Sequence, residues 1–125
     1  MNIQVIQETF SICKVTTYTD VAIQADYCFI GKTDEECSLV CLTRDVPSHT
    51  LARDDGWRAF RLEGVLDFSL IGILSAISSL LAQAHIGIFA VSTYNTDYIF
   101  VKQEQLDKAL QVLQHEGYTI VPHLE

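Results

Sequence analysis

Two short polar segments, residues 63–72 and 92–97, hold the side chains best suited to bind a small charged molecule. Asp67 and Asp97 stand at the ends of a segment that contains no Lys, Arg, Asp or Glu between them. A small zwitterionic ligand would need an anion beside its cationic group and amide donors for its anionic group. A helix beginning near Leu70 would offer free amides and the positive end of its dipole. Asp97 would supply the counter-charge for an ammonium or guanidinium group.

Each of these residues also has a purely structural explanation, and both explanations stay open. Asn-Thr-Asp at 95–97 is ordinary turn chemistry, which is compatible with a ligand contact at Asp97. Asp67 or Ser69 can accept hydrogen bonds from the first turn of the following helix. Gly72 fits either a close approach by a ligand or a contact between helix and sheet.

Composition indicates a folded domain with an acidic surface. The chain has 125 residues, of which 49% are hydrophobic, and it carries 8 basic against 16 acidic side chains. This length can bury a core, and the charge balance argues against nucleic acid and anionic membranes as partners. The N-terminus shows no signal peptide, and the serines, Gln83 and His85 within 68–91 argue against a transmembrane helix. We therefore expect a cytoplasmic protein.

The first half predicts strands with little helix. Residues 2–16 favour one or two strands, 19–25 a short helix, and 27–30 and 38–42 a hairpin. Residues 43–56 are polar, contain Pro47 and end in Asp-Asp-Gly, which predicts a junction between two halves. The four cysteines lack the spacing of zinc ligands and are predicted to be reduced, buried thiols.

The second half predicts alternating strands and helices. Its spacing gives a strand at 57–62, a helix at 70–84, strands at 86–92 and 98–101, a helix at 103–116 and a strand at 118–121. The nearly all-apolar strand 86–92 is expected in the centre of its sheet. This βαββαβ order is the ferredoxin-like arrangement, an antiparallel sheet with helices on one face. The sequence thus predicts an α+β protein with a truncated first half at 1–56 and a complete second half at 57–125.

Motifs for catalysis are missing from the sequence. It contains no P-loop, nucleophile elbow or GxGxxG segment, and its four histidines have no metal-ligand spacing. We expect no enzymatic activity, no metal and no cofactor.

The segments TDEECSLVC, LDFSLIGIL and STYNTDYIFV, with the helix at 106–117, resemble the ACT-domain superfamily of small-molecule sensors. More specifically, they are similar to short bacterial tandem ACT-like proteins related to the CASTOR arginine sensors of animal cells. The resemblance covers most of residues 27–120.

The resemblance implies a non-enzymatic regulatory domain that binds a small amino acid or related metabolite at an interface between ACT-like units. It places ligand contacts in the loop between the first strand and the first helix and in the Thr-aromatic-Asn-Thr-Asp segment. A possible homodimer is among the implied partners. A protein–protein interaction or oligomerisation module without a small ligand is the alternative. The candidate ligand-binding residues are Asp67, Phe68, Ser69, Ile71, Gly72, Ser92, Thr93, Tyr94, Asn95, Thr96 and Asp97.

Overall fold

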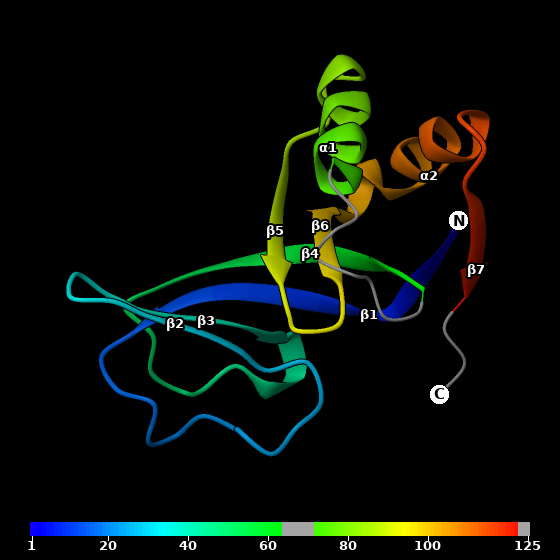
Figure 1. Ribbon diagram of the computed structural model, residues 1–125. Helices are drawn as coiled ribbons and strands as arrows, with labels where there is room; N and C mark the ends of the chain where they lie inside the picture. The colour runs from blue at the N-terminus through cyan, green and yellow to red at the C-terminus, as the bar shows by residue number, and fades with distance from the viewer. Residues whose placement is uncertain (64–71, 123–125) are drawn as a thin grey trace. The chain divides into compact units, whose positions relative to one another are not determined.

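The computed structural model describes residues 1–63 and 72–122, which form two compact units (Figure 1). Unit 1 contains residues 1–7 and 58–125, and unit 2 contains residues 8–57. Two strands, β1 (Asn2–Val15) and β4 (Ala52–Leu62), cross the boundary and give residues to both units. Residues 1–7 thus group with the C-terminal part of the chain, while the division into related halves at 56/57 stays a prediction.

Unit 1 confirms the predicted order of strands and helices. A 3-10 turn, η2 (Gln103–Gln105), occupies the start of the predicted 103–116 helix, so that the α-helix itself begins three residues later. After β4 come α1 (Ile73–Gln83), β5 (Ile88–Ser92), β6 (Asp97–Lys102), η2 (Gln103–Gln105), α2 (Leu106–His115) and β7 (Thr119–Pro122).

The sheet of unit 1 departs from the predicted, fully antiparallel arrangement. β5 and β6 form the expected antiparallel hairpin, with Ser92 opposite Asp97. However, β1 lies between β4 and β7, and it pairs with β7 in parallel. The resulting strand order in this unit is β7-β1-β4-β6-β5. The prediction that 86–92 is a central strand is wrong, since β5 is the last strand in this order.

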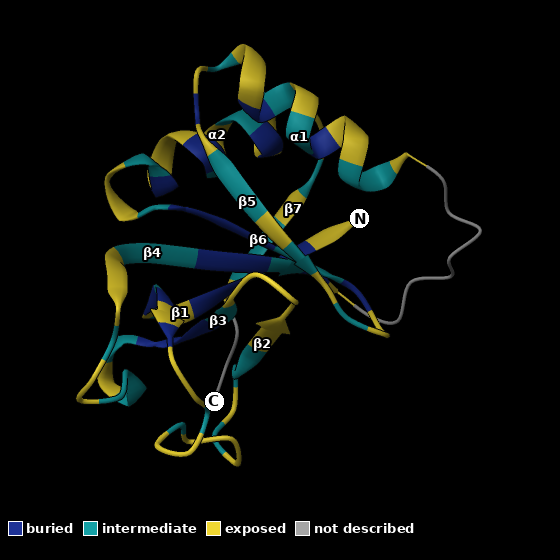
Figure 2. Cartoon of the chain, turned by 90° about the vertical axis from the view of Figure 1, so that its left-hand side faces the viewer, coloured by how far each residue is buried: buried dark blue, intermediate teal, exposed yellow. Residues whose placement is uncertain are grey.

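Both helices pack against one face of this sheet through a shared core (Figure 2). In α1, Ile77 and Leu81 are fully buried, four residues apart on the predicted apolar stripe. Strands β1, β4 and β6 contribute alternate residues to the same core. The residues between them therefore point to the other face of the sheet, away from the helices. The buried core residues are Ile3, Val5, Phe60, Leu62, Ile77, Leu81, Ile86, Ile99, Val101, Leu106, Ala109 and Leu113.

The two helices end in the same hydrogen-bonded motif but use different residues for it. In α2 the predicted stop is confirmed: Gly117 has φ 101°, and Tyr118 N–H donates to the Leu113 carbonyl at 3.1 Å. In α1 the equivalent left-handed residue is His85, with φ 62°, and Ile86 N–H donates to the Leu81 carbonyl at 2.9 Å. Both ends are Schellman motifs, which normally favour glycine at the left-handed position.

Unit 2 adds β2 (Phe29–Lys32), β3 (Cys37–Leu42) and the 3-10 turn η1 (Thr43–Asp45) to parts of β1 and β4. The helix predicted at 19–25 is absent, and this segment instead makes turns such as Val21 N–H to the Tyr18 carbonyl at 3.2 Å. A helix of this length gains too few hydrogen bonds to offset its nucleation cost.

The polar junction predicted at 43–56 is also partly wrong, because β4 already begins at Ala52. The hydroxyl of the buried Ser11 on β1 donates to the Asp55 carboxylate at 2.5 Å, within the first part of β4. Gly56 has φ 83° within β4, a conformation that glycine adopts without strain.

The cysteines are free thiols, and two of them, Cys13 and Cys41, are buried. Both lie in the small core of unit 2 with Val15 and Leu39. Burial raises the pKa of Cys41 to about 12, because the thiolate would lose its hydration. The prediction of buried thiols therefore holds for these two, whereas Cys28 and Cys37 are half-buried.

The hairpins of the two units repeat each other. In each, a threonine N–H donates to a carbonyl three residues on, from Thr33 to Glu36 at 2.9 Å and from Thr93 to Thr96 at 2.8 Å. In each, a six-residue strand then leads directly into a 3-10 turn, as β3 into η1 and β6 into η2. This match pairs Thr33 with Thr93.

None of the helices within the described residues is both long and apolar enough to cross a membrane.

Candidate functional site

The turn between β5 and β6 is built by the hydroxyl groups of two threonines. Thr93 Oγ1 donates to the Thr96 carbonyl at 3.0 Å and accepts from the Thr96 N–H at 3.3 Å. Thr96 itself is 8% exposed, and its Oγ1 donates to the Leu62 carbonyl at 3.1 Å. Since Leu62 ends β4, this bond attaches the turn to the neighbouring strand.

At the base of this turn, Ser92 and Asp97 face each other across the hairpin. Ser92 Oγ donates to Asp97 Oδ1 at 2.6 Å, a short charge-assisted hydrogen bond. The Asp97 carboxylate is therefore held by its own hairpin. The hairpin alone therefore gives Asp97 a structural role. A ligand contact at Asp97 stays a prediction.

A polar pocket of about 330 Å³ lies beside the turn, within unit 1. This volume is at the lower end of the range for small-molecule sites and suits a ligand of amino-acid size. Three members of its wall come from the turn and four from the strands. The lining residues are Thr93, Asn95 and Thr96, with Gln4, Arg61, Leu62 and Tyr98.

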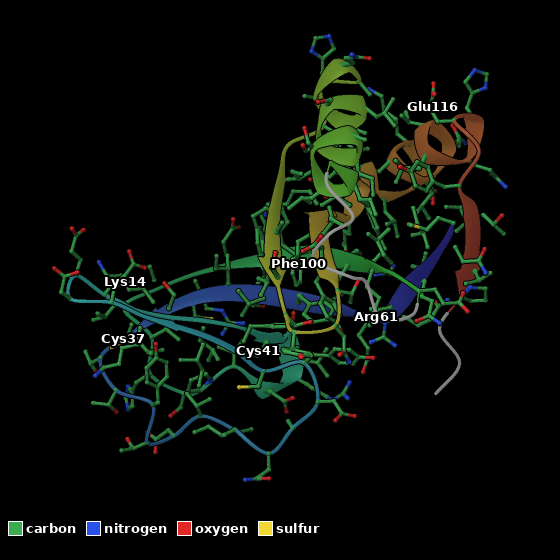
Figure 3. All side chains as sticks on the ribbon, in the orientation of Figure 1. Lys14, Cys37, Cys41, Arg61, Phe100 and Glu116 are labelled. Carbon is green, nitrogen blue, oxygen red and sulfur yellow. The ribbon has the colours of Figure 1, made fainter. Side chains whose placement is uncertain are left out.

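Arg61 supplies the positive charge of this pocket, at the C-terminal end of β4 (Figure 3). Its Nε donates to Gln4 Oε1 at 3.0 Å, and Nη1 donates to the Tyr98 hydroxyl at 2.7 Å. The guanidinium carbon also lies 5.6 Å from the centre of the Tyr98 ring, within the range of a cation–π contact. These contacts hold the guanidinium in a defined orientation.

Strand alternation explains why these three side chains meet. Gln4 lies between the core residues Ile3 and Val5, and Arg61 lies between Phe60 and Leu62. Tyr98 precedes the core residue Ile99 on β6. Because alternate residues of a strand point to opposite faces, all three project from the face opposite the helices.

Apart from Gly72, the predicted site residues fall into four groups. Thr93, Asn95 and Thr96 line the pocket together, whereas Ser92 and Asp97 are outside its lining. Tyr94 is 83% exposed at the tip of the turn. Asp67, Phe68, Ser69 and Ile71 lie outside the described residues.

Gly72 lies at the start of α1, with φ 90° and no side-chain cap. A Cβ added there would meet none of the described atoms within 4 Å, which argues against a tight contact between helix and sheet. The left-handed conformation itself accounts for glycine at this position.

Sequence reasoning missed Gln4, Arg61 and Tyr98. The one available signal is the alternation of the 57–62 strand, which puts Arg61 on the face opposite Phe60 and Leu62. The pairing of β1 with β4, which brings Gln4 to Arg61, is not visible in the local pattern.

A second pocket, of about 390 Å³, lies between the C-terminal turns of α1 and α2 in unit 1. It contains none of the predicted site residues. No group of three or more His, Cys, Asp or Glu side chains suited to a metal ion occurs within residues 1–63 and 72–122.

Comparisons with known proteins agree with this fold. A family model described as ACT domain matches residues 52–115. The solved structure of protein Atu0741 from Agobacterium tumefaciens is 28% identical, with a TM-score of 0.84 over 99% of this chain and 94% of that one. Protein VC0802 from Vibrio cholerae, described as of unknown function and a possible transport protein, is 19% identical. Its TM-score is 0.70, over 91% of this chain and 88% of that one.

The regulatory subunit of aspartate kinase from Thermus thermophilus, in a ligand-free form, has the same fold. Its TM-score is 0.66 at 10% identity, covering 94% of this chain and 98% of that one. A search of curated proteins gives no significant match. Since the family model covers more than half of the sequence, the chain belongs to the ACT domain family.

Proposed function

We propose that this chain is a regulatory domain that binds a small amino acid or related metabolite and catalyses no reaction. The observation that carries this proposal is the pocket lined by the β5–β6 turn and Arg61. It combines a guanidinium, hydroxyl groups and two side-chain amides around a volume of about 330 Å³. ACT membership and the fold shared with an aspartate kinase regulatory subunit support the regulatory role.

The proposal keeps the predicted relationship to tandem ACT-like proteins of the CASTOR type. The matching hairpins at Thr33 and Thr93 support two related halves, 1–56 and 57–125, of which the first is degenerate. Binding would act by stabilising one state of the protein over another, because a ligand shifts only states that contact it differently.

Thermal-shift measurements against the twenty amino acids at millimolar concentration test this function. A rise in melting temperature with one or a few of them is expected, because ligand binding to the folded state stabilises it. Thr119→Val changes an exposed residue of β7 and serves as a control. The ligand should raise its melting temperature by the same amount as that of the unmodified chain. The absence of a shift with every amino acid would refute amino-acid binding.

A second candidate function is an interaction module, and β5 favours it. This strand ends the sheet order, has the uncharged sequence IFAVS and exposes Ala90. An apolar edge strand presents unpaired backbone groups to another chain. Native mass spectrometry distinguishes the candidates: a dimer without ligand that Ala90→Glu dissociates would favour the interaction module. A monomer unaffected by Ala90→Glu would reject it.

A further inference from the structure

The pocket between the ends of α1 and α2, here called the helix-end pocket, has an apolar floor and a polar rim. Its volume of about 390 Å³ lies within the range of small-molecule sites. The lining residues of the floor are half-buried apolar side chains that pack against the core of unit 1, namely Leu80, Ala84 and Val112. Those of the rim are exposed and polar, namely Gln83, Gln111, His115 and Glu116.

The electrostatics of the helix-end pocket favour a cation. α1 ends at Gln83 and α2 ends at His115, so the last turns of both helices line it. The C-terminal end of a helix carries the negative end of its dipole. Glu116 directly follows α2 (Figure 3) and is the one acidic residue among the described lining residues, which include no Lys or Arg. His115 counts as neutral at pH 7, so this rim offers negative charge above an apolar floor.

We propose that the helix-end pocket binds a small organic cation, a free primary amine on an unbranched chain of about four to six carbons. The hydrocarbon chain lies on the floor, where its apolar surface leaves water. The ammonium group lies at the rim, beside Glu116 and the two helix ends. This pocket shares no lining residue with the pocket of the β5–β6 turn, so the inference does not depend on the proposed function.

The rim also matches the hydrogen-bonding needs of an ammonium group. Such a group has three N–H donors and no acceptor. Gln83 and Gln111 bring a side-chain carbonyl oxygen from each helix, and Glu116 brings a carboxylate. One primary amine can therefore use acceptors from both helices.

Both parts of the ligand are needed for useful affinity. An exposed pair of opposite charges contributes only about 1.5- to 5-fold. Each CH₂ group that is fully buried contributes up to about fourfold. A short amine lacks the second contribution, and an uncharged molecule of the same length lacks the first. Affinity that depends on both charge and chain length is thus the signature of this site.

Backbone amide NMR of the ¹⁵N-labelled full chain tests the proposal, at about pH 8, where an ordinary histidine is neutral. The probes are ethylamine, butylamine, hexylamine, butanol and butyrate. We expect the amines to shift the amide signals of Gln83, Ala84, Gln111 and Val112 in a saturable way. Affinity should rise about 3- to 10-fold from ethylamine to butylamine. Butyrate should bind at least about tenfold more weakly than butylamine.

Two variants with the same change of charge separate the local effect of Glu116 from the net charge of −8. Glu116→Lys places an ammonium at the rim and should weaken butylamine binding about 3- to 30-fold. Glu104→Lys, at an exposed position of η2 outside the pocket lining, should change it less than about twofold. Lysine is favourable at the C-terminal end of a helix, so Glu116→Lys is expected to fold.

Several outcomes would overturn the proposal. Equal affinities for butylamine, butanol and butyrate would remove the role of charge, and equal affinities for ethylamine and butylamine would remove the role of the floor. Equal weakening by Glu116→Lys and Glu104→Lys would show that only net charge matters. Tighter binding of Nα-acetyl-lysine methylamide than of any free amine would assign the pocket to a lysine side chain of a protein partner instead.

Discussion

Replacing Thr96 with valine isolates the hydrogen bond that attaches the pocket wall to β4. The Thr96 hydroxyl donates to the Leu62 carbonyl at 3.1 Å, and Thr96 and Leu62 are 8% and 1% exposed. Valine keeps the shape of threonine but removes the donor, so a buried carbonyl loses this partner. The free energy of unfolding should fall by about 1 to 3 kcal/mol.

Urea denaturation measures this loss. With a slope of about 2 kcal/mol per molar urea, the midpoint should fall by about 0.5 to 1.5 M at unchanged slope. Thr119→Val on β7 is the control, because it makes the same chemical change at an exposed position and should stay within about 0.5 kcal/mol. Equal midpoints for the two variants would refute the anchoring role of the Thr96 hydroxyl.

Three further predictions concern stability. Ile3→Ala should lower the free energy of unfolding by about 2 to 5 kcal/mol in urea denaturation, because Ile3 is fully buried in the core of unit 1. A smaller change would mean that β1 is dispensable for the stability of this core. His85→Gly should raise the free energy of unfolding by about 0.5 to 1 kcal/mol, and Gly117→Ala should lower it by about 1 kcal/mol, because both positions are left-handed. Melting temperatures of the two variants that both rise or both fall would contradict this. Burial raises the pKa of Cys41 from 9.0 to about 12, so the folded state holds the thiol proton more tightly than the unfolded state does. The contribution of this thiol to folding stability is complete below pH 9. It is lost as the pH rises from 9 toward 12, because the unfolded thiol ionises first. Urea midpoints at about pH 8 and about pH 10.5 should therefore drop less in Cys41→Val than in the unmodified chain.

The local elements of the second half were predictable because each has its own pattern. The stripe that buries Ile77 and Leu81 marks α1, and Gly117 marks the end of α2. The end of α1 was less obvious, since His85 takes the conformation in which glycine is expected. Such positions are decided by the surrounding packing and not by the residue's own preference.

The arrangement of strands was not predictable from the same patterns. β5 is apolar on both faces, which suggests a central strand, yet it lies at the edge of the sheet. Part of this character is explained by Phe89, which stacks on Phe100 of β6 with ring centres 4.5 Å apart. The parallel pairing of β1 with β7 joins residues from the two ends of the chain, and no local signal reports it.

The candidate site divides in the same way. The threonines and Asn95 of the turn could be proposed from a contiguous motif, and the structure places them on one pocket wall. Arg61 is one of three arginines in β4, and no motif distinguishes it from the other two. Its importance appears only when strand order brings Gln4 and Tyr98 to either side of it.

The two strands that cross the boundary between the units limit how this domain can be exchanged between genes. A segment covering only 58–122 would encode both helices but omit Ile3 and Val5, which belong to their core. A segment ending before Ala52 would deprive unit 2 of its part of β4. Recombination near residues 57 and 58 therefore yields two incomplete products. We expect the two units to be inherited, lost and transferred together.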